Sequence, residues 1–216
     1  MKVIITGTTG MVGEGVLLEC LQNNKVSEVL SISRKPCEIK NPKLKELLVF
    51  DFTKLQDFEN NIKGYDACFY CAGVSSAGLS EEKYHYITFD TTIAFAKALL
   101  KANPKITFCF VSGRSTDSTE QGKVMWQRVK GKTENALKQM PFKSEYSFRP
   151  SLMKPTKGQK HFYGYNLWAH KIFYPFFRLF FPACTIQEIG KAMINVTINR
   201  YSKNILDEKA IKLMSQ

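Results

Sequence analysis

The stretch Thr6-Gly7-Thr8-Thr9-Gly10-Met11-Val12-Gly13 decides the fold. It follows a short β-branched run, Lys2–Thr6, and precedes apolar residues at helical spacing over residues 12–21. Glycines at this spacing permit a tight turn, close approach of backbone N–H groups to a pyrophosphate, and close contact between helix and sheet. An ordinary strand-to-helix turn needs fewer glycines. The stretch therefore predicts a dinucleotide-binding loop.

Strand and helix patterns alternate along the rest of the chain. The expected strands are Lys2–Thr6, Val29–Ser33, Leu47–Phe50, Ala67–Cys71, Ile106–Ser112 and Tyr146–Arg149. The expected helices cover residues 12–21, 55–60, 80–101, 124–139 and 185–199, and residues 204–214 are expected to hold one short strand and one helix. Such alternation indicates a parallel sheet covered on both faces. The fold class is therefore α/β, a Rossmann-type doubly wound parallel sheet with a small C-terminal appendage.

Length and composition are those of a domain with a full core. The chain has 216 residues, of which 44% are hydrophobic and 12% aromatic, and this excludes disorder, collagen and small disulfide scaffolds. No linker or repeat interrupts it. We expect one domain, 1–216, with a dinucleotide-binding core at 1–152 and a substrate or lid appendage at 153–216.

The net charge indicates which kind of binding partner to expect, and the cysteine content indicates the cellular compartment. Thirty-one Lys and Arg against nineteen Asp and Glu give a net charge of +12, which favours anionic partners. Six cysteines without a secretory leader predict free thiols in the cytoplasm. Cys68 and Cys71 have the Cys-x-x-Cys spacing of a redox or zinc site, but they lie in an expected strand, where residues three apart point to opposite faces. The three histidines are far apart in the sequence, so no metal site is expected.

The end of the second expected strand reads Ser33-Arg34-Lys35. A site that prefers NAD usually places Asp or Glu here, where it binds the ribose 2′-hydroxyl. After Ser33, the first carboxylate in the sequence is that of Glu38. Two cations and a hydroxyl would attract a 2′-phosphate, so the sequence favours NADP, with NAD as the alternative. A solvated basic loop is the other interpretation of these residues.

Three further features carry a resemblance to a known family. They are the Asp51-Phe52 pair after the third strand, the Cys71-Ala72-Gly73 end of the fourth, and Ser112 at the end of the fifth. With the glycine stretch, and over roughly residues 1–152, the chain resembles the short-chain dehydrogenase/reductase superfamily. More narrowly it is similar to the atypical and extended branch of NAD(P)-dependent epimerase/dehydratase-like proteins, close to the group containing the human Tat-interacting oxidoreductase-like protein.

The resemblance implies a cofactor contact for each matching position. The pyrophosphate would lie on the glycine stretch, the adenine beside the third strand, the ribose beside the fourth and the nicotinamide beyond the sixth. The residues so implied are Gly7, Thr9, Gly10, Met11, Val12 and Gly13; Asp51 and Phe52; Cys71, Ala72 and Gly73; and Pro150, Ser151 and Leu152.

The resemblance also implies a catalytic Tyr-x-x-x-Lys pair on one helix and a serine on the fifth strand. Here the helix reads Trp126-Gln127-Arg128-Val129-Lys130, so the lysine is present and the tyrosine is not. An indole cannot release its proton near neutral pH, and Trp126 is either a lid on the nicotinamide pocket or a packing residue. The family's serine falls on Ser112 or Gly113, with Ser115 further on.

Several groups could replace the missing phenol as a proton source. Water is one, and five side chains fall near the expected cleft. They are Tyr84, His85, His161, Tyr163 and Tyr165.

A basic, aromatic segment covers residues 142–181. We interpret it first as a substrate lid and an oligomer face, which leaves room for a homodimer. Peripheral contact with an anionic membrane is a second interpretation, and nucleic acid is disfavoured because no RNA or DNA motif is present.

Two functions therefore remain open. In the first, the protein is an NADP-dependent reductase or epimerase-like enzyme, in which Lys130 fixes the ribose and Ser112 holds the oxygen of a small-molecule substrate. In the second, it is a non-catalytic dinucleotide-binding sensor or scaffold that acts through a protein or membrane partner.

Overall fold

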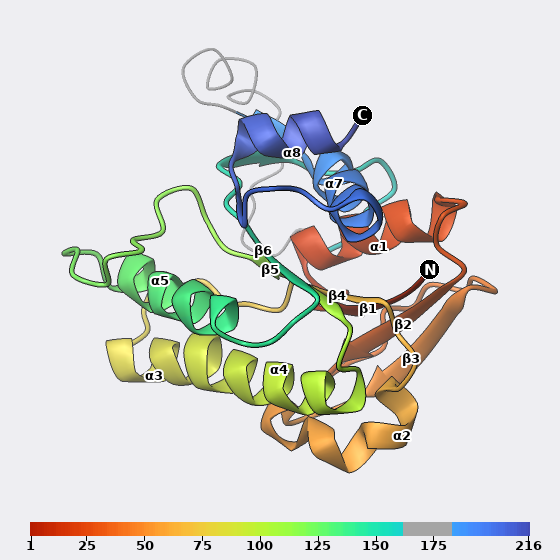
Figure 1. The fold of residues 1–216 in the computed structure, drawn as a ribbon, viewed down its shortest axis with the longest axis horizontal. Coiled ribbons are helices and arrows are strands. Elements are labelled where there is room, and N and C mark those ends of the chain that lie inside the picture. Colours follow the sequence, from red (N-terminus) through yellow and green to blue (C-terminus); the bar gives the residue numbers. More distant parts are fainter. Residues whose placement is uncertain (162–182) are drawn as a thin grey trace.

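The computed structural model describes residues 1–161 and 183–216. Within these residues, seven parallel strands form one sheet in the order β3-β2-β1-β4-β5-β6-β9 (Figure 1). The strands are β1 (Lys2–Thr6), β2 (Glu28–Ser33), β3 (Leu44–Leu48), β4 (Ala67–Tyr70), β5 (Thr107–Val111), β6 (Ser144–Phe148) and β9 (Ile205–Leu206). The order reverses between β1 and β4, which is the point where doubly wound sheets bind their ligands. The predicted Rossmann-type fold class is confirmed.

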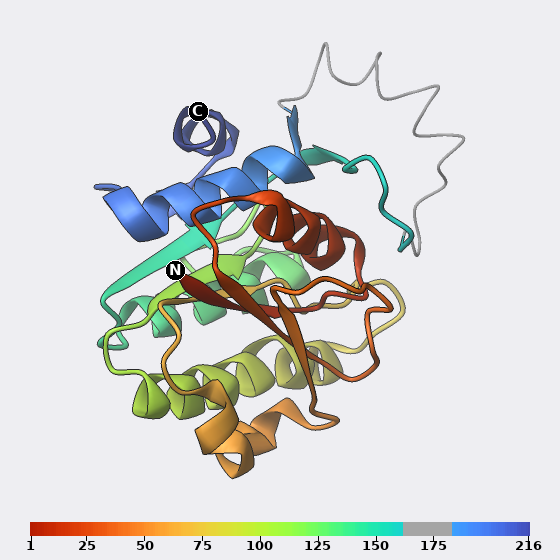
Figure 2. The ribbon, with the colours of Figure 1, turned by 90° about the vertical axis from the view of Figure 1, so that its right-hand side faces the viewer.

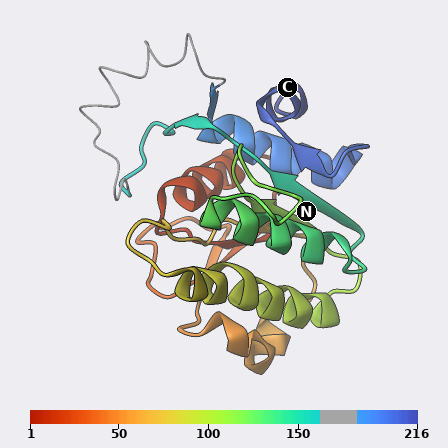
Figure 3. The ribbon, with the colours of Figure 1, turned by 90° about the vertical axis from the view of Figure 1, so that its left-hand side faces the viewer.

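Helices cover both faces of the sheet (Figure 2 and Figure 3). One face carries α1 (Met11–Gln22), α7 (Ile186–Asn199) and α8 (Glu208–Met214). The other carries the 3-10 helix η1 (Phe52–Phe58), α2 (Glu59–Ile62), α3 (Glu81–His85), the π-helical turn η2 (Tyr86–Asp90), α4 (Thr91–Ala102) and α5 (Met125–Lys138). Successive residues of β1 enter different cores, since Val3 and Ile5 face α1 and α7 whereas Ile4 faces α4. Burial on both faces explains why this strand is an unbroken apolar run.

The predicted order of elements agrees with the structure, but the third strand is displaced. The sequence predicts Leu47–Phe50, whereas β3 covers Leu44–Leu48 and pairs Leu44 with Val29. This is an edge strand, and charged residues such as Lys45 and Glu46 are common on exposed edges, where they weaken the apolar signal of a strand.

The C-terminal part of the chain adds to the sheet and to the α1 face. β9 pairs with β6, and two strands that the sequence did not predict, β7 (Leu152–Lys154) and β8 (Ala183–Thr185), form a separate parallel pair. α7 lies so close to α1 that a Cβ atom on Gly15 would stand 2.4 Å from Cγ2 of Ile186. Much of the basic aromatic segment, residues 162–182, lies outside the described residues, including the stripe Ile172, Phe176, Leu179 and Phe180.

Candidate dinucleotide and active site

Two glycines of the loop after β1 lie where a side chain does not fit. Gly7 has φ +70°, and a Cβ atom there would stand 2.8 Å from the backbone nitrogen of Ala72. A Cβ atom on Gly13 would stand 2.1 Å from the carbonyl oxygen of Gly7. These contacts are with backbone atoms, which cannot rotate away. The loop therefore packs tightly both on the end of β4 and on the first turn of α1.

The N-terminus of α1 has backbone donors available for an anion. Its N-cap residue, Gly10, has no capping side chain, and the first helical hydrogen bond runs from Glu14 N to Gly10 O at 2.9 Å. Within the described residues, the N–H groups of Met11, Val12 and Gly13 have no hydrogen-bond partner. Such N–H groups, with the positive end of the helix dipole, bind phosphate groups. A pyrophosphate fits this cradle.

The switch point between β1 and β4 is joined by one threonine. Thr6 Oγ1 accepts hydrogen bonds from the backbone N–H groups of Cys71 and Ala72, at 3.1 and 3.0 Å. Cys71 and Ala72 are half-buried, and Gly73 beyond them is exposed. The structure thus brings the glycine loop and the predicted ribose-side residues into direct contact.

The end of β2 carries the predicted 2′-phosphate residues. Ser33 is buried, and its hydroxyl donates to the carbonyl oxygen of Lys35 at 2.6 Å, which shapes the turn. Arg34 and Lys35 are exposed, and neither forms an ion pair within the described residues. Two uncompensated cations therefore stand beside the β2 end of the sheet.

Asp51 and Phe52, the residues predicted to flank the adenine, follow the end of β3. Asp51 caps η1, since Thr53 donates to its carboxylate from N at 3.0 Å and from Oγ1 at 2.6 Å, and these bonds lower the pKa of Asp51. The ring of Phe52 is buried against Phe95, with ring centroids 5.3 Å apart. Phe50, which the sequence analysis passed over, is 79% exposed. The ring available at this edge is therefore that of Phe50, and the misplaced strand boundary concealed it.

Trp126 and Lys130 lie one turn apart on α5, and both reach the end of β5. The Lys130 ammonium donates to the carbonyl oxygens of Val111 and Ser112, at 3.0 and 3.3 Å. The Trp126 indole lies against Gly113, where a Cβ atom would stand 3.3 Å from ring atom Cζ3. Burial lowers the pKa of Lys130 to about 8. The spacing of four residues thus brings the indole and the ammonium to one strand end.

The two serine positions have different surroundings. Ser112 is buried, and its hydroxyl is 2.8 Å from the hydroxyl of Thr116. Gly113 has no side chain, and Ser115 is exposed. Thr116 was missed by the sequence analysis because only the folded turn after β5 brings it to Ser112.

A largely buried ion pair that the sequence analysis also missed holds α5 in place. Arg149, at the end of β6, donates from Nε to both carboxylate oxygens of Glu134, at 3.0 and 3.1 Å. Its Nη2 donates to Ser118 Oγ at 2.6 Å. The pair therefore fixes α5, the turn after β5 and the segment at Pro150 relative to one another.

The segment beyond β6 returns to α1. Pro150 is buried, and Ser151 and Leu152 are half-buried at the start of β7. Further on, the buried side chain of Gln159 donates to the carbonyl oxygen of Met11 at 2.6 Å. The buried carboxylate of Glu14 accepts the backbone N–H groups of Lys160 and His161, at 2.8 and 2.7 Å. The first turn of α1 is thus joined to residues 159–161.

The candidate replacements for the missing phenol lie in different environments. Tyr84 is buried, and burial raises its pKa, so its proton is harder to release. His85 lies 3.0 Å from Asp90 and 3.2 Å from Lys132. His161 Nδ1 lies 3.2 Å from Glu14. Tyr163 and Tyr165 lie outside the described residues.

All six cysteines are free thiols. Among residues 1–161 and 183–216, no three His, Cys, Asp or Glu side chains are grouped to hold a metal ion. In the same ranges, no helix has the length and apolar character needed to cross a membrane.

Comparison with known proteins agrees with this geometry. A family model described as the NAD dependent epimerase/dehydratase family matches residues 3–136, which include the glycine loop and the Trp126–Lys130 helix. The chain belongs to this family. The loop, the switch point and the end of β5 are therefore parts of an NAD(P)-binding epimerase/dehydratase-like fold.

The chain is also similar to two curated relatives and to two solved structures. It is 26% identical to protein HTATIP2 of Rattus norvegicus over 154 residues, which is 70% of this chain and 62% of that protein. It is 28% identical to the mitochondrial protein FMP52 of Debaryomyces hansenii over 155 residues, 71% of this chain and 67% of that protein. The match to HTATIP2 therefore covers less than two thirds of that protein's length.

The fold matches the enzyme WbmF of Bordetella bronchiseptica in complex with NAD+, with a TM-score of 0.69, 12% identity, and coverage of 99% of this chain and 76% of that chain. It also matches a short chain dehydrogenase of Burkholderia cenocepacia in complex with NADP, with a TM-score of 0.67, 12% identity, and coverage of 95% and 86%. At this identity the likeness shows the fold alone.

Proposed function

We propose that the protein is an NADP-preferring oxidoreductase or epimerase-like enzyme of the short-chain dehydrogenase type that acts on a small-molecule substrate. The observation that carries the proposal is the uncapped N-terminus of α1. Its Met11, Val12 and Gly13 N–H groups have no hydrogen-bond partner among the described residues, and they lie beside glycines that leave no room for side chains. This cradle fits a pyrophosphate held by main-chain amides.

The preference for NADP rests on Arg34 and Lys35. Both are exposed at the end of β2, and neither forms an ion pair with a carboxylate in the part of the chain that the structure describes. A guanidinium and an ammonium form charge-assisted hydrogen bonds with a phosphate, whereas a 2′-hydroxyl gains little from them. The exposed ring of Phe50, at the end of the neighbouring strand, is positioned to stack on the adenine.

The chain's own residues would divide the chemistry at the end of β5. When bound, the nicotinamide supplies or accepts a hydride. Lys130 holds the ribose hydroxyls with its ammonium, and Ser112 or the Thr116 hydroxyl beside it orients a substrate oxygen. Trp126 excludes water from one side, and the proton comes from water or from a side chain such as His161.

A non-catalytic NADP(H)-binding sensor or scaffold is the second candidate, and Trp126 is the observation that favours it. The indole fills the space over Gly113 and has no proton to give. In such a protein, dinucleotide occupancy would set the affinity for a protein or membrane partner.

Fluorescence titration with NADPH and NADH tests the cofactor preference. We expect tighter binding of NADPH in the wild type, and a loss of about ten-fold or more in NADPH affinity in Arg34→Ala/Lys35→Ala, with little change for NADH. Lys97→Ala, an exposed lysine on α4, is the control. Tighter binding of NADH in the wild type would overturn the preference, and no binding of either would overturn the whole proposal.

The cellular location and the oligomeric state form a further part of the proposal. We propose a cytoplasmic protein and a homodimer, with peripheral membrane contact as the alternative use of the basic aromatic segment. Fractionation of cells separates the cytoplasm from the mitochondrion, the compartment named for FMP52. Light scattering of the purified chain tests the dimer.

A further inference from the structure

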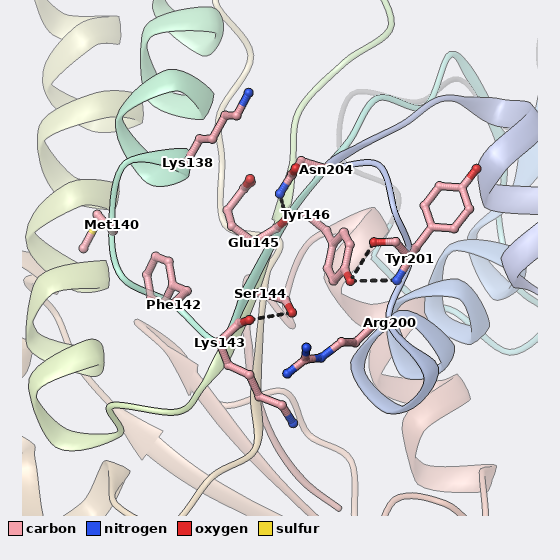
Figure 4. A pocket seen from close by; sticks show the side chains of 10 residues that line it. All are labelled: Lys138, Met140, Phe142, Lys143, Ser144, Glu145, Tyr146, Arg200, Tyr201 and Asn204. Carbon is pink, nitrogen blue, oxygen red and sulfur yellow. Dashed lines mark hydrogen bonds between the residues drawn. The ribbon is translucent and has the colours of Figure 1, made fainter.

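A polar cavity of about 350 Å³ opens where β6 begins (Figure 4). The cavity lies where the parallel strands begin, whereas the glycine loop lies where they end. The two sites are therefore at opposite ends of the strands. The walls come from the end of α5, the start of β6 and the turn between α7 and β9. The residues that line the cavity include Lys138, Lys143, Glu145, Arg200, Tyr201 and Asn204.

Three cations border this cavity, and one of them, Lys138, is close enough to the carboxyl group of Glu145 to favour its charged form. Lys138, Lys143 and Arg200 are exposed, and none forms an ion pair within the described residues. In Figure 4, the ends of Lys143 and Arg200 point to the same side of the cavity, while Lys138 stands on the other side of Glu145. Like charges that share one hollow repel each other and attract an anion into it.

The backbone of Arg200 is strained at the position that aims its side chain into the cavity. Arg200 follows the last residue of α7 with φ 56° and ψ 157°. Side chains with a Cβ atom rarely adopt this conformation, and glycine is the usual residue where a helix ends with positive φ. An arginine at this position lowers the local stability, because its backbone is strained, but it supplies a guanidinium group to the cavity.

The walls around these cations are held together by hydrogen bonds. The Tyr146 hydroxyl accepts from Tyr201 N at 2.9 Å and donates to Tyr201 O at 3.3 Å, and Asn204 Nδ2 donates to the carbonyl oxygen of Glu145 at 2.7 Å. These bonds fix the turn after α7 against β6. The site is therefore built before any ligand arrives, and less ordering accompanies binding.

The one carboxyl group in the cavity is turned to its own strand. Glu145 is buried and accepts a hydrogen bond from Ser147 Oγ at 2.7 Å. Burial raises its pKa to about 7, so that near neutral pH it is neutral in a large part of the molecules and repels an anion little.

We propose that this cavity binds a small phosphorylated molecule. Arg200 and Lys143 would hold the phosphate, Lys138 would add charge, and the half-buried rings of Phe142 and Tyr201 would flank the organic part. A guanidinium with two ammonium groups suits a phosphate dianion better than a carboxylate. This site is separate from the dinucleotide site.

Calorimetry of the full chain with phenyl phosphate tests this site. The titration is made at about 0.15 M salt, which screens loose surface attraction, and with excess NADPH to occupy the glycine loop. We expect saturable binding that Arg200→Gly weakens about ten-fold or more, the size expected for a lost charge-assisted contact. Lys143→Gln should weaken it too, and Lys97→Gln should not.

The Arg200→Gly variant also separates binding from folding. Because a glycine at this position would relieve the backbone strain, the melting temperature of Arg200→Gly should equal or exceed that of the wild type. Three results would each overturn the proposal: no saturable binding, equal affinity in wild type and Arg200→Gly, or phenol binding as tightly as phenyl phosphate.

Discussion

The ammonium group of Lys130 donates a 3.0 Å hydrogen bond to the carbonyl oxygen of Val111, the last residue of β5. The protonated amine is therefore held at the strand end where the proposed ribose would lie. Burial lowers the pKa of Lys130 to about 8, so the amine loses its proton only slightly above neutral pH.

Affinity for the dinucleotide should fall as the pH rises through about 8, because the ribose hydroxyls lose a charged donor when Lys130 is deprotonated. Titration of NADPH between pH 7 and about 9.5 measures this. Lys130→Arg should keep its affinity over the same interval, since arginine stays charged. A fall of equal size in Lys130→Arg would show that another group titrates.

Trp126→Tyr should reveal whether the protein is a disabled reductase. A phenol one turn before Lys130 restores the acid that the family uses, so NADPH oxidation in a panel of carbonyl compounds should rise by about two orders of magnitude. Trp126→Phe is the control, because it alters the packing on Gly113 without adding a proton donor. If the wild type turns over and Trp126→Tyr is no faster, the proton comes from elsewhere.

Gly13→Ala should damage the phosphate loop. The new methyl group would meet the carbonyl oxygen of Gly7 at 2.1 Å, so the loop must move. We expect a loss of about 1–3 kcal/mol in the free energy of unfolding, and weaker NADPH binding. Gln22→Ala, at the exposed end of the same helix, should change neither. Unaltered NADPH affinity in Gly13→Ala would contradict the described loop.

Glu134→Gln should be far more costly than the removal of an exposed ion pair. It leaves the guanidinium of Arg149 buried with no carboxylate, and we expect a loss of about 3 kcal/mol in unfolding free energy. Glu81→Gln breaks the exposed contact with Arg128, and should lose less than about 1 kcal/mol. Urea unfolding measures both. Similar losses would mean that the Arg149 pair is not buried as described.

Glu145 should make stability fall between pH 4.5 and about 7, because its folded pKa is raised from 4.5 to about 7. The folded state then holds the proton more strongly than the unfolded chain, so stability present at low pH is lost as the pH rises. We expect a loss on the order of 2–3 kcal/mol. Urea unfolding of Glu145→Gln should lack this component, whereas an identical pH profile would assign the loss to other groups.

Features that depend on a short stretch of backbone could be predicted from the sequence. Contacts between side chains that are far apart in the sequence could not. The glycines at 7, 10 and 13 indicate the loop because their requirement is local, a turn and a helix start within one short stretch. β3 was misplaced because Lys45 and Glu46 break its apolar pattern at an exposed edge, and that error concealed Phe50. Arg149 and Glu134 come into contact only after β6 and α5 have packed, so no spacing in the sequence predicts their ion pair.

The hydrogen bonds that join Met11 and Glu14 of α1 to residues 159–161 give this helix two roles. The first turn of α1 would present amides to the proposed diphosphate, and it also anchors the chain at residues 159–161. A displacement of that turn would move both its N–H groups and the anchored chain. The free energies of dinucleotide and substrate binding should therefore be coupled. By thermodynamic reciprocity, a substrate that orders the anchored chain would tighten the dinucleotide by the same factor.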